Sequence, residues 1–173
     1  SHGGTEMGQG LHIKVAQVVA DAFGIPLEKV KITASNTGKV PNTSATAASS
    51  GSDLNGMAAQ NAAEQIKARL IDWAAEKYSV ERDQVVFEPN VVRIGNRRVA
   101  FNELIHEAYL GRVHMSAAGF YKTPELHWDR AAGKGRPFYY FPYGAAVSEV
   151  VVDTLTGEWK LLRADILHDA GKS

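Results

Sequence analysis

Two short stretches of small residues, each directly before an apolar helical pattern, constrain this chain more than any other feature. The first run spans residues 3–10, with the sequence GGTEMGQG, and the second run spans residues 43–52, with the sequence TSATAASSGS. The first N–H groups of a helix lack partners within the helix and lie at the positive end of its dipole. Two such helix starts in one small chain predict a site for an anionic ligand that accepts many hydrogen bonds.

Apolar spacing predicts a helix behind each run. The first helix is expected from Leu11 to Ala22, because Gly24 and Pro26 then end the pattern. The second is expected from residue 52 or 53 to residue 77. Its predicted buried stripe consists of Leu54, Ala58, Ala62, Ile66, Leu70 and Trp73. We expect the small residues in its first half to lie near a ligand and its charged second half to face solvent.

The remainder of the chain reads as short strands, hairpins and one further helix. Strands are predicted at 30–33, 85–87, 91–94, 113–121, 145–153 and 158–167, and a loop at 122–137. Asn102 is the predicted N-cap of a helix over 103–110, and the aromatic cluster at 138–143 is expected in a core or interface. Helices and hairpins without regular alternation predict the α+β class, with a helical part over 1–80 and a hairpin-rich part over 81–173.

Composition excludes several classes of function. The chain has 19 basic and 19 acidic residues, so it lacks the positive charge that nucleic acids and acidic membranes attract. No apolar run approaches the roughly 20 residues of a membrane span, and no signal peptide pattern is present, so the expected location is cytoplasmic. The absence of cysteine excludes disulfides, a thiol nucleophile and iron–sulfur ligands within these 173 residues.

No residue of the chain is predicted to be catalytic. The six histidines show neither metal-ligand spacing nor a neighbouring serine nucleophile motif, so each is interpreted as a surface or core histidine. Glu6 is the one tempting general base, but its position favours a loop carboxylate that orders nearby backbone N–H groups. Gln9 lies between two glycines, where its amide can donate and accept hydrogen bonds toward a ligand.

Several ordered segments resemble one enzyme family. Residues 2–12, HGGTEMGQGLH, and residues 40–49, VPNTSATAAS, resemble the two cofactor-binding segments of the molybdenum hydroxylases. The stretches 119–124, 138–141 and 144–157 are similar to the large, molybdopterin-binding subunit of bacterial xanthine dehydrogenases. The resemblance covers the whole chain and implies that it is part of the molybdenum cofactor-binding domain of a xanthine oxidase-like enzyme.

This resemblance implies which residues hold the cofactor. The expected cofactor-binding residues are Gly8, Gln9, Thr46, Ala47, Ala48, Ser49, Ser50, Gly51 and Ser52. Ala48 matches the position beside the metal, where it offers only backbone and a methyl group, so the pterin dithiolene is expected to supply the metal ligands. The catalytic glutamate of the family lies in a G-E-P-P-like motif that this chain lacks. The chain is therefore expected to be an internal piece of a larger subunit, inactive by itself.

The family also implies a reaction and partners. Its members hydroxylate hypoxanthine and xanthine to urate with water as the oxygen source, and pass electrons through 2Fe–2S clusters to FAD. The expected partners are a purine substrate, the remainder of the large subunit, and a small iron–sulfur and FAD subunit in a hetero-oligomer. Two alternatives remain open: an aldehyde or N-heterocycle hydroxylase subunit of the same superfamily, or a non-enzymatic assembly module that binds a pterin or nucleotide.

Overall fold

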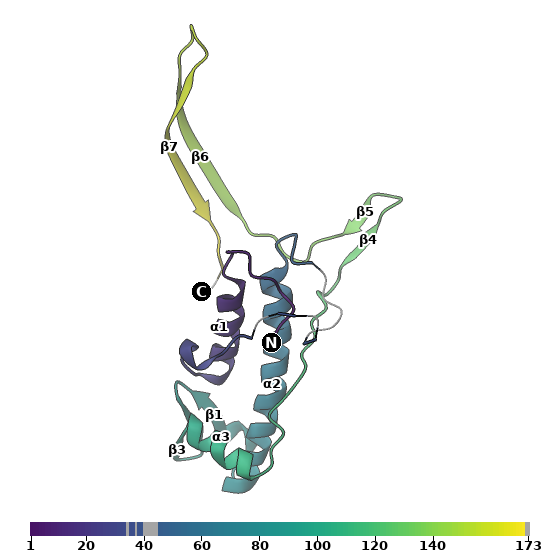
Figure 1. Cartoon of the computed structure of the whole chain (residues 1–173), viewed down its shortest axis with the longest axis vertical. Helices are drawn as coiled ribbons and strands as arrows, with labels where there is room; N and C mark the ends of the chain where they lie inside the picture. The colour runs from purple at the N-terminus through teal and green to yellow at the C-terminus, as the bar shows by residue number, and fades with distance from the viewer. Residues whose placement is uncertain (34, 37, 40–44, 172–173) are drawn as a thin grey trace. The chain divides into compact units, whose positions relative to one another are not determined.

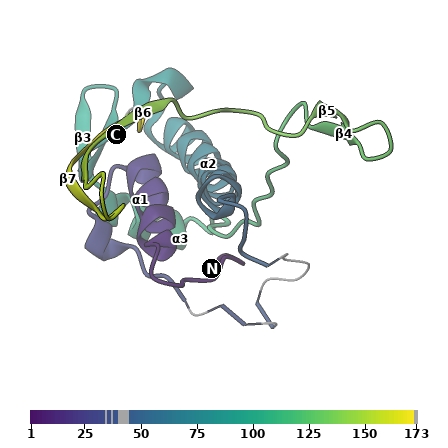
Figure 2. The ribbon, with the colours of Figure 1, turned by 90° about the horizontal axis from the view of Figure 1, so that it is seen from above.

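Residues Ser1–Lys122 form the first of two compact units. Within it, the two helices predicted behind the small-residue runs lie side by side and begin at the same end (Figures 1 and 2). The computed structural model describes residues 1–33, 35–36, 38–39 and 45–171. Helix α1 spans Leu11–Phe23 and helix α2 spans Gly51–Tyr78. Their parallel arrangement brings the first and second runs to one place.

Helix α1 forms where the apolar spacing predicts it. Leu11 and Val15 are buried on its inner face, and the helix ends at Gly24 with a φ of 65°. That left-handed conformation favours glycine because a Cβ is disfavoured there. A short 3₁₀ turn, η1 (Leu27–Lys29), follows. The strand predicted at 30–33 is wrong, since no sheet of the described residues includes this stretch and an isolated strand has no ladder partner.

The predicted buried stripe of helix α2 is largely wrong. Of its six residues only Leu70 is fully buried; the buried positions are Gly56, Ala63, Leu70, Ala74 and Ala75. The reason is geometric, because the predicted residues follow a spacing of about four, which drifts around an α-helix, whereas most of the buried positions are spaced by seven or four and share one face. Its second half, expected in solvent, packs instead into the main core with a three-stranded sheet and helix α3.

That core lies between the end of α2, the sheet and α3. The strands β1 (Val85–Glu88), β2 (Val91–Ile94) and β3 (Arg97–Ala100) are antiparallel in the order β1-β2-β3. Strands β2 and β3 are joined by a two-residue turn at Gly95 and Asn96. The buried cluster comprises Ala74, Ala75, Val85, Val92, Ile94, Val99 and Leu104. A second apolar contact, among Phe23, Phe87 and Phe101, joins the end of α1 to this core.

Helix α3 (Phe101–Leu110) begins earlier than predicted, and Asn102 is not its N-cap. Ala100 occupies that position, and Phe101 donates its N–H to the carbonyl of Asn90. Helix α3 thus begins at Phe101 rather than at the predicted residue 103, and the Phe101 ring contacts Phe23 and Phe87. The helix ends before Gly111, as predicted.

The segment 113–122 follows helix α2 as an extended chain, so the predicted strand at 113–121 is wrong (Figure 1). Its hydrogen-bond partners are helix side chains rather than another strand. The carbonyls of His114 and Ser116 accept from Arg69, at 2.6 and 2.9 Å. Gln65 donates to the carbonyl of Ala118 at 3.3 Å, and the N–H of Phe120 donates to Asn61 at 3.4 Å. Residues four apart on one helix face thus hold the segment.

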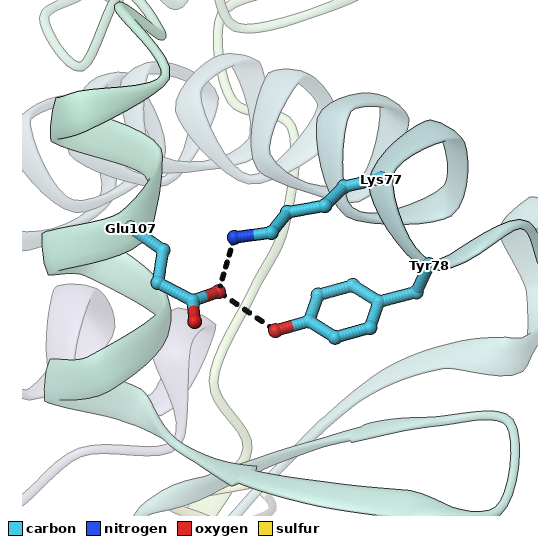
Figure 3. A network of polar contacts seen from close by, with 3 residues as sticks. All are labelled: Lys77, Tyr78 and Glu107. Atoms are coloured by element: carbon cyan, nitrogen blue, oxygen red, sulfur yellow. Dashed lines mark hydrogen bonds and ion pairs between the residues drawn. The ribbon is translucent and has the colours of Figure 1, made fainter.

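A polar network fastens α3 to the end of α2 (Figure 3). One carboxylate oxygen of Glu107 accepts hydrogen bonds from the Lys77 ammonium at 2.8 Å and from the Tyr78 hydroxyl at 2.7 Å. Burial and the bond to Glu107 raise the pKa of Tyr78 to about 12, and the bond from Lys77 lowers the pKa of Glu107. The neutral phenol and the ionised carboxylate are therefore the stable forms here.

Replacing Tyr78 with phenylalanine is expected to lower the local stability of α3 by about 1 kcal/mol, the usual value of one such hydrogen bond. Below pH 10.0, the ordinary pKa of the phenol, its contribution is complete; it is lost as the pH rises through about 12. Hydrogen exchange of the α3 amides in the intact protein measures both effects. Equal exchange in the wild type and the Tyr78→Phe variant would contradict this account.

Residues Thr123–Ser173 form a second compact unit, which contains two hairpins. Strands β4 (His127–Asp129) and β5 (Lys134–Arg136) pair within the predicted loop. Strands β6 (Gly144–Val152) and β7 (Trp159–His168) form the predicted long hairpin, with an irregularity between Glu149 and Val150. The aromatic side chains expected in a core or interface are exposed in this chain: Phe138, Tyr139, Tyr140, Phe141 and Tyr143.

Helices combined with antiparallel hairpins confirm the α+β class. The structure separates its two units after Lys122, whereas the expected separation of roles, between 1–80 and 81–173, stays a prediction. Within the described part of the chain, no helix has the length and apolar character that a bilayer crossing requires.

Candidate functional site

A cavity of about 550 Å³ opens between the starts of α1 and α2. The first run and α1 contribute Met7, Gln9, Leu11 and Lys14 to its lining. The second run and α2 contribute Thr46, Ala47, Ala48, Ser49, Gly51 and Ser52. Seven of the nine residues expected to hold a cofactor therefore lie together, while Gly8 and Ser50 are not among the lining residues. Thr43 and Ser44 of the second run lie outside the described residues.

Glu6 organises the first run in the manner interpreted from the sequence. Its carboxylate accepts backbone N–H bonds from Gly8 and Gly10, both at 2.9 Å, and from His12 at 3.0 Å. These bonds, led by that of His12, lower the pKa of Glu6 to about 2. An ionised carboxylate at the start of α1 also suits the positive end of the helix dipole. Glu6 is thus a structural acceptor, and a group so strongly ionised is a poor proton acceptor.

Gln9 lines the cavity, but its amide also closes its own loop. The side-chain oxygen accepts from the N–H of Met7 at 2.6 Å, and the side-chain nitrogen donates to the carbonyl of Thr5 at 2.8 Å. An amide has two N–H donors and two acceptor lone pairs. One donor and one lone pair of Gln9 therefore remain for a ligand while the loop stays in place.

The two runs are joined directly through Thr46. Its hydroxyl oxygen accepts the backbone N–H of Thr5 at 2.8 Å, across 41 positions of sequence. Gly51 allows the close approach on the other side, because a Cβ there would lie 3.3 Å from the Thr46 methyl group and 3.4 Å from Leu11. Leu11 is itself buried at the start of α1. These contacts make the two runs one continuous wall.

The backbone before α2 takes an unusual course. Ala48 and Ser49 both have positive φ angles, of 57° and 58°. Non-glycine residues rarely adopt this region, and such strain is concentrated at binding and active sites. The Ser50 hydroxyl donates to the carbonyl of Ala47, so the side chain of the N-cap residue caps no N–H group of α2. Among the described residues, no side chain accepts from the backbone N–H groups at this helix start, which can therefore bind a ligand or water.

A buried histidine, His2, accepts a hydrogen bond from the backbone of the first run. The N–H of Gly4 donates to Nδ1 of His2 at 3.1 Å, so Nε2 of His2 carries the proton and donates to Nδ1 of His12 at 2.9 Å. Burial lowers the pKa of His2, which keeps this arrangement neutral. Among the described residues no three His, Asp or Glu side chains converge as a metal site. His2 is thus a buried histidine with hydrogen bonds to Gly4 and His12, and its interpretation as purely structural stays a prediction.

A second polar cluster, at segment 113–122, has a serine beside a histidine but the wrong proton arrangement for nucleophilic catalysis. Ser116 Oγ lies 2.7 Å from Nε2 of His114, whose Nδ1 lies 3.2 Å from the guanidinium of Arg69. Because a guanidinium only donates, Nδ1 must accept and Nε2 carries the proton. His114 then donates to the serine, whereas a general base must accept its proton.

Sequence reasoning missed three residues of the cavity wall: Met7, Leu11 and Lys14. Met7 lies inside the first run, and Leu11 was assigned only to the apolar face. Lys14 carried a usable signal, because a lysine at the end of a first helical turn opposes the usual charge preference of helix starts.

The fold is α+β, and its cavity lies between two helix starts. A family model described as a molybdopterin cofactor-binding domain matches residues 1–173. The chain belongs to this family.

Two curated relatives are similar over the whole chain. It is 48% identical over 173 residues to a xanthine dehydrogenase of Oryza sativa subsp. japonica. It is 43% identical over 173 residues to a xanthine dehydrogenase/oxidase of Gallus gallus. In both comparisons the whole of this chain is covered but only 11% of the relative.

Solved structures share the fold. A reconstituted CO dehydrogenase from Oligotropha carboxidovorans matches with a TM-score of 0.77 at 24% identity, over 95% of this chain and 20% of that chain. A quinoline 2-oxidoreductase from Pseudomonas putida 86 matches with a TM-score of 0.73 at 19% identity, over 95% of this chain and 21% of that chain. These likenesses support the α+β architecture of the domain.

Proposed function

We propose that this chain holds the molybdopterin cofactor of an enzyme that oxidises xanthine. The observation that carries the proposal is the cavity at the two small-residue runs, in a chain whose family binds this cofactor. Identity of 43–48% along the whole chain to proteins named xanthine dehydrogenase supports the purine branch. The chain spans only 11% of those relatives, so activity belongs to the protein that contains it.

The residues of the cavity fit the chemistry of such a cofactor. Thr46, Ser49 and Ser52 bring hydroxyl groups, Gln9 retains a donor and an acceptor, and the start of α2 offers backbone N–H groups. Ala48 is proposed to lie beside the metal, while Ala47 and Gly51 admit the ligand through their small size. Gly8 and Ser50 do not line the cavity, and they are proposed to act by shaping the turns that lead into α1 and α2. The bound molybdenum would supply oxygen transfer from water, and these residues would bind and orient the cofactor.

The wider reaction scheme follows from this proposal. The intact protein would hydroxylate hypoxanthine and xanthine to urate and pass electrons to 2Fe–2S clusters and FAD. We propose that these groups lie on a small partner subunit of a cytoplasmic hetero-oligomer, as in bacterial enzymes, and that the rest of the large subunit provides the purine pocket and the catalytic glutamate.

The intact protein that contains this chain should be purified and its molybdenum and pterin measured per chain, together with urate formed from xanthine and an electron acceptor. Near-stoichiometric molybdopterin with urate formation is expected, and the isolated 173-residue chain should form no urate. Turnover of aldehydes or other N-heterocycles without urate would replace the substrate assignment. Pterin binding without any turnover would favour the assembly module, and an absence of pterin would overturn the proposal.

Replacing Thr46 with valine is expected to speed the loss of pterin from the intact protein about fivefold. The variant keeps the shape of the side chain but removes the acceptor for the N–H of Thr5, at about 1 kcal/mol. Thr156→Val is a matched control, because Thr156 accepts the N–H of Glu158 in the β6–β7 turn and lies outside the cavity. Retention equal in both variants would show that the junction of the runs is unimportant for binding.

A further inference from the structure

Lys14 is the one cation among the described residues that line the cavity. The family resemblance implies no role for it. It lies at the end of the first turn of α1, its side chain is exposed, and it lines the cavity. The hydrogen bonds and ion pairs of the described residues include none from its ammonium group. Its backbone N–H, in contrast, is used within the helix, donating to Gly10.

An anion bound at this cavity would be favoured by the Lys14 ammonium group and by the helix starts around it. The positive ends of two helix dipoles meet at this cavity, and a lysine near such an end is normally disfavoured. Glu6 offsets the charge at α1, but its two oxygens already accept three backbone N–H groups. Asp53, the acidic residue in the first turn of α2, is not among the lining residues.

The chemistry available around the ammonium group is that of a phosphate site. Ser49 and Ser52 contribute hydroxyl groups to the same cavity, and the N-cap residue of α2, Ser50, caps the helix with no side-chain bond. Helix-start N–H groups together with a lysine form a recurrent phosphate-binding combination, in which the lysine acts as a point charge. The strained turn at Ala48 and Ser49 leads directly into this helix start.

We propose that the Lys14 ammonium binds a phosphate oxygen of the cofactor and so determines how firmly the anionic end is held. This inference rests on the proposed function, because it names the anionic group as the phosphate of the pterin cofactor. Lys14 is a binding residue in this account, and it takes no part in proton transfer.

The first experiment measures pterin retention in the intact protein for the wild type, Lys14→Gln and Lys14→Arg, at low and high salt. Lys14→Gln should release pterin about tenfold faster at low salt, whereas Lys14→Arg should stay close to the wild type. Added salt should accelerate release from the wild type more than from Lys14→Gln, because screening acts on the lost pair. Lys29→Gln is the charge-matched control, since Lys29 lies in η1 away from the cavity.

The second experiment separates this inference from the proposed function. Cofactor-free intact protein is compared in potassium phosphate and in potassium chloride of equal ionic strength, by hydrogen exchange of the peptide covering 45–55. Phosphate should protect this peptide in the wild type and not in Lys14→Gln. If the intact protein contains no pterin when it is first purified, yet phosphate protects the peptide in a way that depends on Lys14, the proposed function alone is overturned. Bound pterin with unchanged retention in Lys14→Gln, or no protection by phosphate in the wild type, would overturn the role of Lys14.

Discussion

Replacing Gly119 with alanine is expected to detach the segment 113–122 from helix α2 in the intact protein. A Cβ at this position would overlap the carbonyl oxygen of Ala58 and lie 2.7 Å from the backbone nitrogen of Ala62. Both neighbours belong to the helix backbone, which cannot move aside as a flexible side chain can. The segment must therefore lift away and weaken the hydrogen bonds that Gln65 and Arg69 donate to it.

The expected loss of local stability is roughly 3 kcal/mol, at the upper end of overpacking effects. Hydrogen exchange of peptides covering 113–122 and limited proteolysis near Lys122 measure this loss directly. Gly56→Ala in helix α2 is the matched control, because its Cβ would meet Val18 at an ordinary 3.6 Å. That change should stabilise the helix by up to about 1 kcal/mol. The two glycine-to-alanine changes should thus act in opposite directions, and similar effects would contradict the packing described.

The cavity was predictable because its parts are encoded locally. A run of small residues before an apolar helical pattern exposes backbone N–H groups wherever the helix lies. The first run and the start of α1 needed no knowledge of distant contacts, and neither did the role of Glu6. What the runs could not reveal is their junction, since the bond between Thr5 and Thr46 depends on how α1 and α2 pack.

The errors concern elements whose environment is set by distant parts of the chain. The stripe on α2 failed because residues at a strict spacing of four drift around the helix, whereas the buried Gly56, Ala63 and Leu70 are spaced by seven and stay on one face. The segment 113–122 has strand-like residues but is bound by the side chains of Asn61, Gln65 and Arg69. Periodicity reports local conformation, and it cannot identify the partner that an extended segment acquires. The proposed role of Lys14 was not predicted, because the net charge of the whole chain does not indicate where a single cation lies.

Replacing Glu6 with alanine is expected to have the largest effect on the cavity, a loss of pterin from the intact protein at least about tenfold faster than from the wild type. The change leaves the N–H groups of Gly8, Gly10 and His12 without their acceptor and removes a negative charge at the start of α1. Asp153→Ala is the matched control, because Asp153 also accepts two backbone N–H groups but in the β6–β7 turn. Pterin retention should be unchanged in that variant.

The Glu6→Gln variant isolates the charge of this carboxylate through its pH dependence. The folded pKa of Glu6, about 2, lies below its ordinary value of 4.5, so its contribution is complete above about pH 4.5 and is lost as the pH falls through about 2. Glutamine does not titrate. Its side-chain NH₂ group would face a backbone N–H group that donates to the carboxylate in the wild type. The difference in thermal stability between wild type and Glu6→Gln should therefore be largest near neutral pH and shrink steadily below pH 4.5. A difference that grows on acidification would mean that protonated Glu6 is the favoured form, and that the first run is held by other contacts.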